Sequence, residues 1–130
     1  MPFKRPRGLR ANERELLEFL VGGPLGCEVL RRQIRSARVT GRCRCGCPSI
    51  TLETDAPELR ATEMKQRSEF GRDDVLEIPA VGRNRAGKRV EVTLHVVYGR
   101  IWELEIWAGW DGGEVRTDVP DVTTLVHGSD

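Results

Sequence analysis

The spacing of apolar residues changes from a helical repeat to a two-residue repeat near position 37. Before that point, apolar residues recur about one helical turn apart in two stretches, Leu16–Leu20 and Leu30–Ile34. Asn12 is followed three residues later by Glu15, which has the form of a capping box at the start of the first stretch. The pattern therefore predicts two short N-terminal helices, the second over about residues 25–36.

After position 37, apolar and polar residues alternate, which is typical of strands that bury one face. The alternation predicts strands over residues 37–45, 50–53, 75–81, 88–98 and 101–110. Hairpin turns are expected at Asn84–Gly87 and at Gly99-Arg100, because glycine and asparagine favour tight turns. Residues 55–73 lack the alternation and are expected to form a long loop with a helical turn or two near 58–65. A short last strand is expected within 119–126.

Each predicted strand has one apolar face, and this feature decides the expected fold class. We expect an α+β fold with two N-terminal helices packed on one face of an antiparallel sheet of about five to six strands. Residues 1–10 are expected to be a flexible basic N-terminus, and residues 11–130 a single α+β domain. In the last long strand, the alternation places Trp102 on the buried face and Trp107 on the exposed face.

Composition indicates an expected location for the protein and shows that charge is distributed unevenly along the chain. The chain is 38% hydrophobic and 32% charged, with no apolar run near the roughly 20 residues of a membrane-spanning helix. No secretory signal pattern begins the chain, so a cytoplasmic location is expected. Residues 1–44 contain eleven Lys and Arg against four Glu, whereas residues 45–130 contain ten against sixteen acidic residues. Either these segments offset each other within the fold, or they form a basic patch or an acidic face for a partner.

The most distinctive stretch is GRCRCGCPSI at residues 41–50, which holds three of the four cysteines. One hypothesis is a small zinc-binding domain, whose candidate ligands are Cys27, Cys43, Cys45 and Cys47. In an extended strand, side chains two residues apart are about 6.5 to 7 Å apart, whereas two thiolates on one zinc lie within about 4 Å of each other. A regular strand cannot chelate zinc with this spacing, but a bend at Gly46 and Pro48 would bring Cys45 and Cys47 together.

Two other interpretations of the cysteines stay open at this stage. Cys43 and Cys45 share the predicted core face with Val39, and free cysteine is often buried as a small apolar residue. A redox pair is the third interpretation, although the usual C-x-x-C spacing before a helix is absent.

The last long strand and the residues after it combine acidic and aromatic side chains. Exposed tryptophans are typical interface anchors. The acidic side chains around them favour a basic protein partner over nucleic acid. The alternative is that the rings fold beneath the tail. The candidate partner-binding residues are Glu103, Glu105, Trp107, Trp110, Asp111 and Glu114.

A third class of function is nucleic-acid binding through exposed arginines. The candidates lie on the outward faces of the second helix and the first strand, with no aromatic residues interleaved: Arg31, Arg32, Arg35, Arg38 and Arg42. Catalysis has less support, because His95 and Cys43 are expected on opposite faces and no nucleophile or phosphate-loop motif occurs. We therefore expect a protein that is not an enzyme.

The cysteine stretch and the later VYGRIWELEIW resemble a group of small uncharacterised bacterial proteins, familiar from actinobacteria, that share a C-x-C-G-C-P-S strand and turn motif. The resemblance extends from Leu16 to about Trp107. It implies a common architecture but no activity, cofactor or catalytic residue. By analogy of size and fold alone, the leading hypothesis is a cytoplasmic, immunity-type inhibitor that binds a protein partner. The zinc-binding and nucleic-acid-binding hypotheses are the alternatives.

Overall fold

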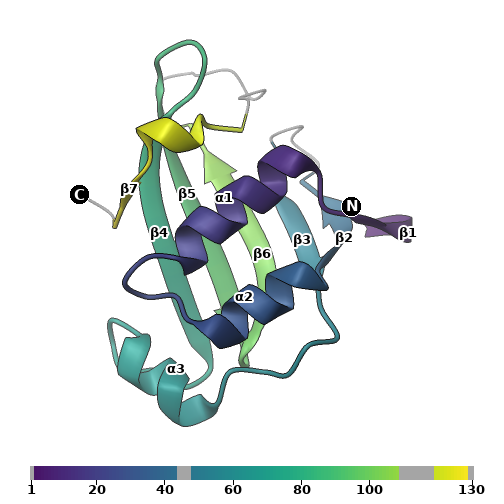
Figure 1. Cartoon of the computed structure of the whole chain (residues 1–130), viewed down its shortest axis with the longest axis vertical. Coiled ribbons are helices and arrows are strands. Elements are labelled where there is room, and N and C mark those ends of the chain that lie inside the picture. Colours follow the sequence, from purple (N-terminus) through teal and green to yellow (C-terminus); the bar gives the residue numbers. More distant parts are fainter. Residues whose placement is uncertain (1, 44–47, 109–118, 129–130) are drawn as a thin grey trace.

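A computed structural model describes residues 2–43, 48–108 and 119–128 of the chain (Figure 1). The described helices are α1 (Ala11–Val21), α2 (Glu28–Arg35), α3 (Ala61–Arg67) and the short 3₁₀ helix η1 (Val122–Thr124). The described strands are β1 (Pro2–Gly8), β2 (Arg38–Arg42), β3 (Ile50–Glu53), β4 (Val75–Arg83), β5 (Arg89–Val97), β6 (Arg100–Trp107) and β7 (Val126–His127). None of the described helices is long and apolar enough to cross a membrane.

The strands form one antiparallel sheet in the order β1-β2-β3-β6-β5-β4-β7. In Figure 1, α1 and α2 lie across one face of this sheet, and α3 lies near one end of the strands. The α+β class and the antiparallel sheet are confirmed. The expected five to six strands are corrected to seven in the described part of the chain, because the N-terminal segment also pairs with the sheet as β1. The short last strand expected within residues 119–126 is found at Val126–His127.

The N-terminal residues differ most from their expected state. Residues 1–10 were expected to be flexible, but Pro2–Gly8 form β1, in which Arg7 lies opposite Val39 of β2. The Arg7 guanidinium holds both carboxylate oxygens of Glu13 on α1, at 2.8 and 2.9 Å. Such a bidentate pair is stronger than a single hydrogen bond. The basic segment is therefore attached to the domain at both the sheet and the helix.

Glu13 also caps the start of α1, whereas the sequence predicted a capping box formed by Asn12 and Glu15. The helix begins at Ala11, and the backbone N–H of Arg10 donates to the Glu13 carboxylate at 2.8 Å. Burial tends to raise the pKa of Glu13. The hydrogen bonds from Arg7 and Arg10 outweigh burial, and the pKa lies below its ordinary value.

The inner face of the sheet and the two N-terminal helices enclose the core. Alternate residues of β5, from Val90 to Val96, have no exposed surface, and they pack with apolar residues of α1 and α2. The one fully buried polar side chain in the described core, Gln33 of α2, accepts from Ile101 N–H at 2.9 Å and donates to the Gly99 carbonyl at 2.7 Å. Gln33 thereby holds α2 at the beginning of β6.

A bulge in β6 overturns the predicted position of Trp102. His95 of β5 pairs with Glu103, but the next residue, Val96, pairs with Ile101, so Trp102 is an extra residue in β6. Ile101 takes the buried position, and Trp102 lies on the outer face with 52% of its surface exposed. Strict alternation cannot predict such an inserted residue.

Candidate functional site

The outer face of the sheet carries the candidate site, on the side opposite α1 and α2. Three strands contribute one row of directly paired residues, in which Glu77 of β4 faces His95 of β5, and His95 faces Glu103 of β6. Glu105 lies two residues further along β6. Side chains on one face of neighbouring strands lie within contact distance, so the row brings three carboxylates around one imidazole. We call Glu77, His95, Glu103 and Glu105 the acidic cluster.

His95 lies at the centre of the acidic cluster and is mostly covered by it, with 19% of its side chain exposed. Its Nε2 is 2.9 Å from an oxygen of Glu105 and 4.0 Å from one of Glu103. Its Nδ1 is 3.8 Å from Glu77. The imidazole therefore has one hydrogen-bonded carboxylate and two further carboxylates at ion-pair distance, each from a neighbouring strand.

The surroundings of Glu103 make the anionic form of its carboxylate unfavourable. Burial is the main influence on its pKa and raises it; the nearby His95 opposes the rise and Glu105 adds to it, and the net pKa lies above the ordinary value. A positive charge placed on the cluster would relieve this cost. The cluster is therefore electrostatically suited to a cationic group supplied from outside.

Two tryptophans flank the acidic cluster along β6. Trp102 is 52% exposed and Trp107 is 38% exposed, although both are large apolar side chains. Trp107 lies opposite Glu91 of β5, so an acidic residue also adjoins it. Large exposed aromatic surface on a folded domain is typical of binding sites.

The structure brings together three of the six predicted partner-binding residues. Glu103, Glu105 and Trp107 lie on one face, whereas Trp110, Asp111 and Glu114 fall outside the described residues. Glu77 and Trp102 belong to the same face and were missed. Counting back from the Asn84–Gly87 turn along both strands would have placed Glu77 opposite His95. The outer position of Trp102 could not be predicted in this way, because the two-residue repeat does not reveal the bulge.

The cysteines are described only in part. Cys43 is exposed, which contradicts its predicted burial on the core face, because the chain leaves β2 after Arg42. Cys27 is half-buried at the start of α2. Cys45 and Cys47 lie outside the described residues.

Helix α2, which Cys27 precedes, and the segment that pairs with Cys43 are fastened at opposite ends of β6. Gln33 fastens α2 to Gly99 and Ile101, at the beginning of β6. Cys43 N–H donates to the carbonyl of Ser49, whose hydroxyl contacts Ile106 near the end of β6. Within the described ranges, no three His, Cys, Asp or Glu residues are placed to hold a metal ion.

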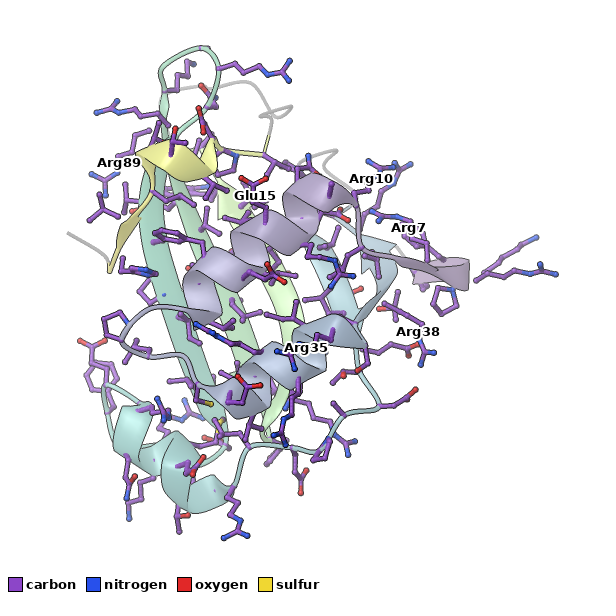
Figure 2. The ribbon with its side chains drawn as sticks, in the orientation of Figure 1. Arg7, Arg10, Glu15, Arg35, Arg38 and Arg89 are labelled. Atoms are coloured by element: carbon purple, nitrogen blue, oxygen red, sulfur yellow. The ribbon has the colours of Figure 1, made fainter. Side chains whose placement is uncertain are left out.

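The five candidate arginines for nucleic-acid binding are all exposed. Figure 2 labels Arg35 and Arg38 near the junction of α2 and β2. Arg32 and Arg35 lie 3.8 and 3.4 Å from Glu28. Arg38 binds Glu53 at 2.9 Å and Asp55 at 3.2 Å. These carboxylates offset much of the positive charge that phosphate binding would need.

Comparison with known proteins found no matching family model, no matching curated protein and no matching solved structure. The interpretation of the site therefore depends on its own geometry.

Proposed function

We propose that this chain is a non-enzymatic interaction protein that binds a basic protein partner through the outer face of its sheet. The observation that carries the proposal is the acidic cluster around His95, flanked by the exposed rings of Trp102 and Trp107. The two kinds of group have complementary roles in recognition. Aromatic rings supply apolar contact area, and the carboxylates select a partner of opposite charge.

The strand framework supports this function because it holds the site in one arrangement. Glu77, His95 and Glu103 are fixed by backbone pairing across three neighbouring strands. A preformed surface loses less conformational freedom on binding than a flexible one does. An inhibitor that must block a partner, as an immunity-type protein does, is one protein for which such a rigid acidic face is suitable. Such a role would place the protein in the cytoplasm with its partner.

The test is a quantitative pull-down with three versions of the chain as bait. The double variant Trp102→Ala/Trp107→Ala removes both rings, and Phe70→Ala removes an 82% exposed ring that lies outside the face. We expect one basic protein to be retained by the wild type and by Phe70→Ala. The double variant should bind this protein, once purified, at least about tenfold more weakly by calorimetry.

The contribution of the carboxylates to binding is tested with this chain and the same purified partner. Glu105→Gln keeps the size of the side chain and removes the charge nearest His95, and Glu18→Gln makes the same change at an exposed position of α1. Association should slow with added salt and with Glu105→Gln but not with Glu18→Gln. Unchanged affinity in both the tryptophan double variant and Glu105→Gln would show that the partner binds elsewhere.

A further inference from the structure

The ion-pair partner of the acidic cluster differs from that of paired carboxylates elsewhere in the molecule. Glu13 is paired with Arg7, and Glu53 is paired with Arg38. In the described ranges, the three carboxylates of the acidic cluster form ion pairs with His95 and with no lysine or arginine. Arginine keeps its charge throughout the physiological pH range, whereas histidine is the side chain that changes charge between about pH 5 and 8. The charge balance of the acidic cluster is therefore open to control by pH.

The charged groups that face His95 come from the two strands beside it. They are the carboxylates of Glu77 on β4 and of Glu103 and Glu105 on β6. The next charged residue on the same face of β5 is Glu91, whose carboxylate contacts an arginine of that strand. Helices α1 and α2 lie across the other face of the sheet (Figure 1). With its three carboxylates ionised, the cluster has a formal charge of −3 when His95 is neutral and −2 when His95 is protonated.

The carboxylates can be reached from solvent, although His95 is mostly covered. The exposed fraction of the side chain is 64% for Glu77, 51% for Glu105 and 30% for Glu103, against 19% for His95. A cationic side chain of a partner would approach these carboxylates from outside the sheet. A proton on His95 would place a positive charge beside the same carboxylates from within the sheet. Both cations would use the same negative charge.

We propose that a proton on His95 and a cationic side chain of the partner compete for the acidic cluster, so that partner binding weakens as the pH falls. This inference rests on the proposed function, because it takes the acidic cluster as part of the partner site. A protonated imidazole hydrogen-bonds to Glu105 at 2.9 Å and offsets part of the charge that attracts the partner. The linkage is reciprocal, because a bound cation must also oppose the protonation of His95 by the same factor.

The test is an NMR titration of the whole ¹⁵N-labelled chain with acetyl-tetraarginine amide, a probe that supplies guanidinium groups on a short peptide. At about pH 8, the peptide should shift the amide signals of His95, Glu103 and Glu105 saturably. Its dissociation constant should rise about tenfold between about pH 8 and pH 5.5, because one positive charge is added at ion-pair distance from the carboxylates.

Two variants separate His95 from the other groups that titrate. His95→Gln keeps a polar side chain that gains no proton, so most of the tenfold rise should disappear. Any rise that is left comes from the carboxylates, such as Glu103 with its raised pKa. His127→Gln is the matched control, since it changes the second of the two histidines, which stacks on Phe19 of α1. This variant should keep the full tenfold rise.

The reciprocal measurement follows the imidazole signals of the wild type and needs no variant. In saturating peptide, the midpoint of the His95 titration should fall by about one pH unit, which corresponds to the tenfold change in affinity. The midpoint of the His127 titration should stay the same.

Each of three results would overturn the inference. The first is a dissociation constant that does not rise as the pH falls, and the second is an equal rise in the wild type and His95→Gln. Either result would leave the proposed function standing, because the peptide would still bind the outer face. The third is no saturable shift at about pH 8 with up to about 10 mM peptide. The proposed function itself would fail only if the tryptophan double variant and Glu105→Gln also kept full affinity for the purified partner.

Discussion

The two faces of β5 lie on one strand but have different neighbours. On the inner face, Val90, Val92, Leu94 and Val96 have no exposed surface, and they pack in the core with residues of the helices. On the outer face, His95 and the residues alternating with it are only half-buried, and polar groups surround them. Strand alternation thus separates the buried core from the face that we propose binds a partner. Substitutions on one face should change folding, and substitutions on the other should change binding.

The largest contrast is expected between neighbouring residues of β5. Leu94→Ala should lower the free energy of unfolding by about 3 kcal/mol, because it removes apolar contacts and leaves a cavity. Thr93→Ala, one residue earlier on the outer face, should lower it by less than about 1 kcal/mol. Urea unfolding of both variants measures the difference. Comparable losses would mean that the outer face is also packed against part of the chain.

A smaller contrast is expected between two hydroxyl groups at β3, one buried and one half-buried. Ser49, just before the strand, is buried; its hydroxyl accepts from Ile106 N–H at 2.8 Å and contacts the Ile106 carbonyl at 3.2 Å. Ser49→Ala leaves these buried backbone groups without their partner and should cost about 2 kcal/mol.

Thr51 provides the matched control on the outer face. Its hydroxyl bonds to that of Thr40 at 2.9 Å in a half-buried position, where water can replace the lost partner. Thr51→Val should therefore cost about 0.5 kcal/mol by the same urea measurement. If Thr51→Val were the more damaging of the two, the buried contacts of Ser49 with Ile106 would not be the stronger ones.

Ser49 also explains part of the GRCRCGCPSI stretch. The described ends of the motif form the β2–β3 pairing, with Arg42 opposite Ile50, and Ser49 extends that pairing to β6. Sequence alternation predicted the two strands, because burial on one face leaves a regular pattern. It could not predict the buried hydroxyl contact, because serine is equally common in exposed turns.

The failures of prediction have two physical origins. The strand formed by Pro2–Gly8 depends on pairing with residues distant in sequence, whereas the bulge at Trp102 depends on the exact register of the β5–β6 hairpin, which alternation does not specify. A segment with two prolines and several basic residues has no strand pattern of its own, although Arg7 binds Glu13 in the folded protein. Only part of the candidate site on the outer face could be predicted. Alternation placed Glu103, Glu105 and Trp107 on one face, but it did not give the strand register that places Glu77 beside His95.

The smallest contrast is expected between two carboxylates whose pKa values are shifted in opposite directions. Glu13, on the covered side, has a lowered pKa, and the outer-face Glu103 has a raised one. A lowered pKa stabilises the folded protein above the ordinary value of about 4.3, and this contribution is lost as the pH falls through the folded-state pKa. A raised pKa has the opposite sign: it costs stability at neutral pH, and the cost disappears as the pH falls.

Glu13→Gln should therefore be less stable than the wild type by about 1 kcal/mol at pH 7, with the difference narrowing below about pH 4.3. Glu103→Gln should be slightly more stable than the wild type at pH 7, with its advantage fading as the pH falls through the raised pKa. Glu15→Gln, exposed on the same helix as Glu13 (Figure 2), is the control for removing a carboxylate from α1. Urea unfolding at intervals from pH 3 to pH 8 gives the three curves. Parallel curves for Glu13→Gln and Glu103→Gln would contradict the prediction. They would mean that the folded-state pKa values of Glu13 and Glu103 are not shifted in opposite directions.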